Sequence, residues 1–468
     1  MRIYSMHKGE FVMVFIAFFA CFGLGVFIGL AGPPPLLTVP SPGWAGNSSA
    51  PQRVRSPALG LRAQQLWLSA AVYTHNDDEE IFDKSFQISI SIEGVLSDHS
   101  LTTLLPASEA TNRTHHLKCK KQICEQVLVL HLGSLEFNHY VFNIQFYGLT
   151  EFHKRYNIRE IVFYFKSYNP SFTQMETWFR FIFLLTTFII TCWFMHSLRK
   201  YSSLDWAIEQ KWLSILLPLL LLFNGPLYPL RLVSSVCISG LLDGWFQATF
   251  LSAVLLSWLA LYHGIRQNER SFVSFYLFKC IVVFMIWCPA VILTFCQKYY
   301  GYYDPTYDYT TSSNYPLLKI TFFSAITFYF LYLLVLIVKA YSDLKNMPFF
   351  DTRLRVVSLA AGSVSLFTAI LAARGWGPAA LQDHWARRPD VHYATSAPFM
   401  SLYGLFNFNL YILAYLFSPG DPSHHDTSIT KDNPAFSMIN DSDEEVIYGS
   451  DEESRRPLNA HHRANEEI

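Results

Sequence analysis

Eight apolar runs, each 18 to 21 residues long, constrain this chain more than any other feature of its sequence. At about 1.5 Å per residue, a helix of this length crosses the roughly 30 Å hydrocarbon core of a bilayer. Apolar helices buried in soluble proteins are usually shorter. The sequence therefore predicts eight transmembrane helices, at residues 11–31, 178–198, 213–233, 245–265, 275–295, 320–340, 356–373 and 399–417.

The composition agrees with a multi-pass α-helical membrane protein. Hydrophobic residues make up 51% of the chain and charged residues only 15%, whereas soluble domains average about 25% charged residues. The formal net charge of −1 is unevenly distributed, because residues 419–468 carry 12 acidic and 4 basic side chains. The total charge gives no sign of nucleic-acid binding, and the acidic segment is typical of a disordered cytosolic tail.

The first span sets the orientation. Residues 1–10 carry one Arg and one Lys and are expected in the cytosol. The apolar run at residues 11–31 is longer than the roughly 7–15 residues of a cleavable signal sequence, so we interpret it as a retained signal-anchor helix. Cleavage after Ala31 is the alternative. Both alternatives place residues 32–176 in the lumen.

Two further features support this orientation. The short cytosolic loops would contain nine Lys and Arg residues and the short luminal loops six, which is the sign of the positive-inside rule. Sequons at Asn47 and Asn112 are expected to carry N-linked glycans, which are added in the lumen.

The luminal segment divides into a linker and a domain. Residues 32–60 contain seven prolines, and proline excludes a helix or a central strand, so we expect a linker there. From residue 61 to residue 176, apolar and polar side chains alternate in runs that indicate half-buried strands. The runs predict a luminal β-sandwich domain, with strands at residues 66–73, 86–92, 127–132, 140–146 and 158–165.

Cys119 and Cys124 are the two cysteines that lie in the long polar segment between the first and second spans. In an oxidising lumen they are expected to form a disulfide that staples a turn. A redox-active pair is the alternative, although the usual redox motif has a closer spacing.

The sequence shows no pattern typical of catalysis. His115 and His116 would point to opposite faces of a strand, with no Cys or carboxylate at metal-ligand spacing, so we interpret both as surface histidines. Nucleophile-elbow, zincin and phosphate-loop patterns do not occur in the sequence. We therefore expect a protein that is not an enzyme and that uses no metal or cofactor.

The third span is rich in residues that disturb a helix, namely Pro218, Asn224, Gly225, Pro226 and Pro229. Proline leaves backbone carbonyls unpaired, which is tolerated in a membrane only where protein or a water-filled cavity satisfies them. We therefore expect a broken helix beside a cavity open to the lumen, with Asn224 and Pro226 among the lining residues. The alternative is a kinked helix packed among its neighbours.

Polar residues in other spans also need an explanation, because burying them in lipid is costly. Asn407 and Asn409 would point to different faces of the last span, so one is expected to bond to a neighbouring helix and the other to face the cavity. Asn407 is the candidate cavity residue. Lys279 lies near the cytosolic end of the fifth span, and we expect its ammonium group to reach the headgroups.

The tail contains candidate regulatory sites. Ser442 and Ser450 each precede three acidic residues, a context that suits phosphorylation by a kinase that recognises downstream carboxylates. Asn433, Pro434 and Phe436 belong to a turn-forming tetrapeptide of the kind that sorting adaptors recognise. These features predict sorting between Golgi, endosomes and plasma membrane, whereas a merely solubilising tail is the alternative.

Four contiguous stretches form specific motifs, at residues 205–212, 216–222, 262–266 and 431–438. In these motifs the chain resembles the Wntless-like family of membrane proteins. The resemblance covers most of the chain, to about residue 454. It implies a GOLD-like luminal β-sandwich followed by a bundle of seven helices at residues 177–418, similar to that of G-protein-coupled receptors. It also implies escort of lipid-modified or membrane cargo, with an acyl chain held in the bundle. The triplet Asn224-Gly225-Pro226 departs from the family pattern by its central glycine.

Two functions of different classes remain. The first is a trafficking receptor that binds a luminal or extracellular protein or lipid-modified ligand through its luminal domain and bundle cavity. Its partners would be membrane lipid, the ligand and cytosolic sorting adaptors. The second is an orphan signalling receptor that couples to G proteins. An embedded hydrolase or transferase has the least support, since His196 and His263 have no obvious carboxylate partners.

Overall fold

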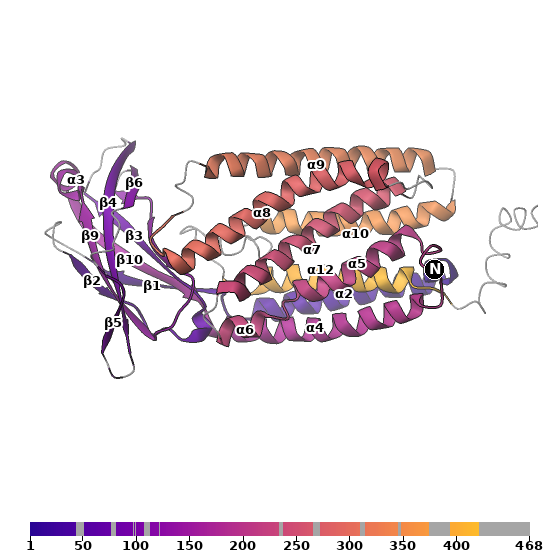
Figure 1. Ribbon diagram of the computed structural model, residues 1–468, viewed down its shortest axis with the longest axis horizontal. Coiled ribbons are helices and arrows are strands. Elements are labelled where there is room, and N and C mark those ends of the chain that lie inside the picture. The colour runs from indigo at the N-terminus through magenta and orange to yellow at the C-terminus, as the bar shows by residue number, and fades with distance from the viewer. Residues whose placement is uncertain are drawn as a thin grey trace, which may run out of the picture.

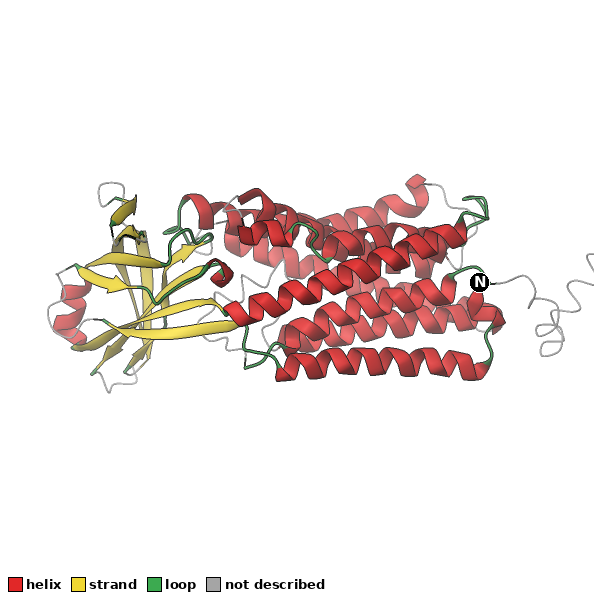
Figure 2. Cartoon of the chain, turned by 90° about the horizontal axis from the view of Figure 1, so that it is seen from below, coloured by secondary structure: helices red, strands yellow, loops and turns green. Residues whose placement is uncertain are grey.

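The computed structural model describes residues 1–43, 51–75, 81–96, 98, 100–106, 113–120, 122–233, 237–264, 272–308, 314–344, 348–373 and 394–420. A β domain lies at one end of the long axis, and a bundle of long helices fills the rest (Figures 1 and 2). The amino terminus lies at the end of the bundle away from the β domain (Figure 1). The first span therefore leads from the end of the bundle opposite the β domain toward the β domain.

Eight of the described helical segments are long and apolar enough to cross a membrane, which confirms the eight predicted spans. The third of them is divided into two helices. The segments are α2 (Lys8–Ala31), α4 (Pro170–Leu198), α5 (Ile208–Phe223) with α6 (Tyr228–Val233), α7 (Cys237–Gly264), α8 (Leu277–Tyr303), α9 (Tyr315–Leu344), α10 (Pro348–Ala373) and α12 (Ala397–Phe417).

Helix α12 is central in the bundle and α2 is peripheral. Within the apolar window of each helix, 67% is buried for α12 but only 11% for α2. The two helices pack closely, because Gly29 has no side chain to hold them apart. A Cβ added at Gly29 would lie 2.6 Å from the Cα of Ala397. Small residues allow this kind of close approach between membrane helices.

The β domain is a two-layered antiparallel structure. One layer has the order β1-β10-β3-β8 and the other β2-β9-β4-β5, and the β6–β7 hairpin joins β4 to β3. The strands are β1 (Leu36–Pro42), β2 (Gln52–Arg55), β3 (Leu66–Thr74), β4 (Ile81–Val95), β5 (Leu101–Leu105), β6 (Arg113–Lys120), β7 (Ile123–Cys124), β8 (Val127–Leu132), β9 (His139–Tyr147) and β10 (Ile158–Tyr168).

The two layers belong to one ten-stranded sheet, in which β9 and β10 are not neighbours. Aromatic contacts between β9 and β10 therefore show that the layers face one another. The ring of Phe142 lies 5.9 Å from that of Phe165, and the ring of Phe146 lies 6.3 Å from that of Phe163. Alternating side chains of each strand thus fill a shared core, as in other sandwiches. The predicted β-sandwich is confirmed.

The expectation that residues 32–60 form only a linker is wrong, because β1 and β2 lie within this segment. Strand β1 pairs with β10 and β2 pairs with β9, and the two strands lie at opposite ends of the strand order. A proline on an edge strand can direct its missing N–H away from the ladder, so prolines are tolerated there. The prolines of β1, Pro40 and Pro42, therefore exclude a central strand but not an edge strand.

The hairpin β6–β7 carries two of the predicted features. Cys119 and Cys124 form a disulfide across it, as predicted. His115 and His116 point to opposite faces, but the interpretation of His115 as a surface residue is wrong. Its side chain is buried beside Phe86, because inward positions of the strand belong to the core. Burial lowers the pKa of His115 below its usual value of 6.5.

The β domain joins the bundle without a flexible linker. Strand β10 ends at Tyr168, and Pro170 begins α4. Between them Asn169 caps the helix, because its side chain accepts a hydrogen bond of 3.0 Å from the backbone N–H of Ser171. The predicted boundary at residues 176 and 177 is thus about two helical turns too late.

A second joint connects β8 to the carboxyl-terminal end of α8. The N–H of Gly133 donates to the carbonyl of Gly301 at 2.7 Å, and the N–H of His131 donates to the carbonyl of Pro305 at 2.8 Å. A Cβ added at Gly133 would lie 2.9 Å from the carbonyl carbon of Gly301. Glycine at both positions therefore allows the two backbones to touch.

Candidate functional site

The third span is broken between α5 and α6, which confirms the predicted break. Helix α5 ends at Phe223 and α6 begins at Tyr228. Gly225 lies in the gap with φ of +74°, a left-handed conformation that glycine accepts without a steric cost. Pro226 follows it and cannot supply an N–H to continue the helix. Pro218, in contrast, lies inside α5 without ending it.

The break brings together two of the predicted polar residues, Asn224 and Asn407. Nδ2 of Asn224 donates to Oδ1 of Asn407 at 2.9 Å, and Nδ2 of Asn407 donates to Oδ1 of Asn224 at 3.0 Å. Thr187 and Tyr411 add hydrogen bonds of 3.2 and 3.0 Å to Oδ1 of Asn407. Both Asn side chains are fully buried. This polar layer ties α4, α5 and α12 together.

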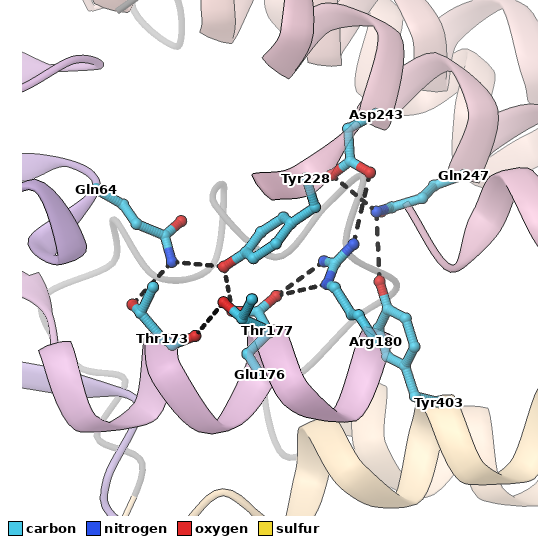
Figure 3. Close-up of polar contacts among 9 residues, drawn as sticks. All are labelled: Gln64, Thr173, Glu176, Thr177, Arg180, Tyr228, Asp243, Gln247 and Tyr403. Atoms are coloured by element: carbon cyan, nitrogen blue, oxygen red, sulfur yellow. Dashed lines mark hydrogen bonds and ion pairs between the residues drawn. The ribbon is translucent and has the colours of Figure 1, made fainter. Parts of the chain in front are cut away.

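A buried ionic cluster centred on Arg180 lies nearer the β domain than this layer, because Arg180 precedes Thr187 on α4. Figure 3 shows the cluster. Arg180 of α4 pairs with Glu176, one helical turn earlier, at 2.8 Å, and with Asp243 of α7 at 3.5 Å. The guanidinium also lies over the rings of Tyr228 and Tyr403, at 4.3 and 4.9 Å from their centroids. All five side chains are buried. Since a buried charge is stable only when paired and hydrogen-bonded, the cluster holds α4, α6, α7 and α12 in one arrangement.

The break and the cluster depend on one another through Gly225. A Cβ added there would lie 2.8 Å from Nη1 of Arg180 and 3.0 Å from Oδ1 of Asp243. The missing side chain therefore leaves the space that the ion pair needs. This gives a physical reason for the glycine at the centre of the Asn224-Gly225-Pro226 triplet.

The cluster continues into the β domain through Gln64 (Figure 3). Gln64 follows the short helix η1 (Leu61–Ala63), and its Nε2 lies 2.9 Å from both the hydroxyl of Tyr228 and Oγ1 of Thr173. The hydroxyl of Tyr228 in turn donates to Oε2 of Glu176 at 2.9 Å. A chain of hydrogen bonds thus runs from the β domain to Arg180.

Four residues of this cluster and its connection are not among the site residues predicted from the sequence: Glu176, Arg180, Tyr228 and Gln64. One signal was available. An arginine at position 180 lies inside the second apolar run, and a carboxylate precedes it at the i, i+4 spacing that brings two helical side chains together. Tyr228 and Gln64 carry no comparable signal, because each acts only through a partner distant in the sequence.

Apolar pockets lie among the described helices, and two of them bear on the predicted cavity. The larger, of about 310 Å³, lies between α2, α10 and α12. The smaller, of about 40 Å³, lies between α5, α7, α10 and α12. Asn409 lines both and donates to the carbonyl of Ala360 at 3.3 Å. Asn224, Pro226 and Asn407, the residues predicted to border a cavity, line neither of these two pockets.

Lys279 differs from its expected placement. Its side chain is buried instead of extending to the headgroups, and its ammonium group donates to the carbonyl of Phe275. The ammonium also lies over the Phe275 ring, 3.7 Å from the centroid. The short π-helix η2 (Phe272–Tyr276) offers this carbonyl, because the turn there is not yet part of α8.

Several predicted sites lie outside the described residues: Asn47, Asn112, Asn433, Pro434, Phe436, Ser442 and Ser450. Among the described residues, no three His, Cys, Asp or Glu side chains are grouped so that they could hold a metal ion.

An amino-terminal helix, a β-sandwich domain and a broken seven-span bundle together define a class of multi-pass membrane proteins. Residues 169–421 match the Wntless-like transmembrane domain, and residues 50–168 match the GOLD domain of TMEM181. The chain is 41% identical to human Transmembrane protein 181 over 457 residues, which are 97% of this chain and 94% of the relative. The chain therefore belongs to the Wntless-like TMEM181 family.

Proposed function

We propose that this protein is a trafficking receptor of the secretory and endosomal pathway, without enzymatic activity. It would bind a luminal or extracellular protein, or a lipid-modified ligand, through the β domain and the bundle. One observation carries the proposal: the hydrogen-bonded chain from Gln64 through Tyr228 and Glu176 to Arg180. Through it, a ligand that displaces η1 would act on the break in the third span.

The larger apolar pocket supports a lipid-modified ligand. At about 310 Å³ it reaches the lower end of the usual range for ligand pockets. It lies between membrane-spanning helices and is lined by Phe15, Phe18 and Phe19 of α2 and by apolar residues of α10 and α12. An acyl chain suits this lining, and the amide of Asn409 could meet a polar group at its end.

Quantitative surface and secreted proteomics after deletion of the gene would test the proposal. Loss of a defined set of proteins is expected, and wild-type protein should restore them. The Gln64→Asn variant should fail to restore these proteins. Asparagine keeps the amide and tolerates the left-handed φ of +57° at this position but shortens the reach to Tyr228. Gln87→Ala, at an exposed position of β4, is the matched control and should rescue fully.

The tail would recycle the receptor between Golgi, endosomes and plasma membrane through cytosolic adaptors. Phe436→Ala should therefore raise the fraction of the receptor at the cell surface, measured by biotinylation.

Glycosidase treatment of the protein, with Asn47→Gln and Asn112→Gln as controls, tests the proposed glycans. The signalling alternative would gain support instead if the purified receptor stimulated nucleotide exchange on a G protein while deletion depleted no cargo.

A further inference from the structure

The first five residues close the cytosolic end of the bundle. They contain the helix α1 (Arg2–Ser5), whose Ile3 is buried in the core of the bundle. The backbone N–H of Arg2 donates to the carbonyl of Ser418, at the end of α12, at 2.9 Å. A helix of four residues is not stable alone in water, so the bundle must hold it in place.

Arg2 lies between two aromatic rings. Its guanidinium carbon is 5.6 Å from the centroid of Trp193, on α4, and 5.1 Å from the centroid of Tyr415, on α12. A guanidinium over an aromatic face is attracted by the electrons of the ring. Two rings from different helices thus form a clamp for one basic side chain.

Tyr4 lies near a buried ion pair. Arg353 of α10 binds Glu209 of α5 through both ends of its guanidinium, with Nε at 2.9 Å from Oε1. Burial raises the pKa of Tyr4 to about 12, although Arg353 acts in the opposite direction. Burial also lowers the pKa of the amino group of Met1. Both shifts have the same main cause, which is the burial of this segment against the bundle.

We propose that the cytosolic mouth of the bundle, formed by Trp193, Glu209, Arg353, Tyr415 and Ser418, is a peptide-binding site. In this structure the chain's own residues 1–5 occupy it. The order of its contacts defines the ligand: a basic side chain for the aromatic clamp, then an aliphatic one for the core, then an aromatic one beside the ion pair. A cytosolic protein with an exposed segment of this order is the partner that the site fits.

Residues 1–5 are covalently connected to α2, so they compete strongly with any free peptide for the mouth. Only Met6 and His7 separate α1 from α2. A short tether gives a local concentration on the order of millimolar, so a free peptide of equal affinity binds poorly while the segment is docked. The mouth therefore becomes available when the segment is released. This site lies at the end of the bundle opposite the β domain and does not depend on the proposed luminal ligand.

Disulfide trapping in the full-length protein tests the docked state. A Cβ added at Gly420 would lie 3.3 Å from Oγ of Ser5, so the pair Ser5→Cys and Gly420→Cys should crosslink under mild oxidation in isolated membranes. Each single variant is a control for the natural cysteines. Adding Ile3→Asp should reduce the crosslink at least about fivefold, since a buried carboxylate is costly. No crosslink in the pair with native Ile3 would overturn the proposal.

Peptide binding tests the site itself. A fluorescent peptide with the sequence of residues 1–6 should bind the Ile3→Asp protein in nanodiscs at least about tenfold more tightly than wild type. Adding Trp193→Ala should abolish this binding, and a scrambled peptide should not bind. Arg2→Gln is a second weakening variant if Ile3→Asp does not fold. The site would be refuted if the native and the scrambled peptide bound equally well to a folded Ile3→Asp or Arg2→Gln protein. It would also be refuted if the native peptide bound to neither variant.

Discussion

Asn224 and Asn407 lie 183 residues apart in the sequence and exchange two side-chain hydrogen bonds of 2.9 and 3.0 Å. The bonds join the end of α5 to α12 at the point where the third span breaks. The break is therefore part of a fixed arrangement, because the amide that closes it is satisfied by a partner on the central helix.

Replacing one member of this pair should cost more than replacing both. Asn407→Leu leaves the amide of Asn224 buried without its partner, which costs about 1–3 kcal/mol. The double variant with Asn224→Leu should recover part of that loss. Thermal unfolding of the purified protein measures these losses of stability, and Asn138→Ala, at an exposed position, is the control. Additive losses in the double variant would show that the two amides are not coupled.

Gly225→Ala should destabilise the protein by about 1–3 kcal/mol, since it adds backbone strain and a contact with Arg180. Gly362→Ala is a matched control, because a Cβ there meets nothing within 4 Å. That control should be neutral or slightly stabilising, because alanine favours a helix. The melting temperatures of the two variants decide the matter, and equal values would contradict the steric role of Gly225.

Arg180→Ala should destabilise the protein by about 3–5 kcal/mol, because it leaves Glu176 and Asp243 as uncompensated buried charges. Neutralising both carboxylates as well, by Glu176→Gln and Asp243→Asn, should restore much of the yield of folded protein. Size-exclusion chromatography and thermal unfolding provide the readout. If the triple variant were no better than Arg180→Ala, the charges would not be the cause.

The contact between Gly133 and Gly301 should hold the β domain against α8. Gly133→Val would force the two backbones apart and should raise hydrogen exchange of the amides at residues 299–304. Gly60→Val places its side chain in open space and serves as control. Unchanged exchange in the Gly133 variant would mean that the joint tolerates separation.

Acidification should weaken the β domain through His115. Its pKa is lowered in the folded state, so the unfolded state binds more protons as the pH falls below about 6.5. The contribution of neutral His115 to stability is therefore present above that pH. It is lost as the pH falls toward the lowered pKa.

His115→Gln should reduce the loss of stability between about pH 7 and pH 5, measured by hydrogen exchange in β6. His116→Gln, at the exposed neighbouring position, is the control and should leave the loss unchanged. The same pH dependence in both variants would exclude a role of His115.

The local sequence determined the eight spans, five strands of the sandwich, the hairpin disulfide and the break at Asn224-Gly225-Pro226. These features follow from short-range chemistry: the length of an apolar run, the alternation of side chains along a strand and the conformational limits of glycine and proline. The strands at residues 36–42 and 52–55 could not be predicted in this way. Proline excludes only central strands, and the sequence does not say which strands are at the edge.

Only the tertiary structure decided which polar side chains meet. Arg180 finds Asp243 from α7 and Tyr403 from α12, and Gln64 reaches Tyr228 from another domain. Asn407 has its partner on α5 and Asn409 has its own on α10, although both belong to one helix. The physical reason is that a buried polar group must be satisfied, whereas its partner is chosen by the packing of helices far apart in the sequence.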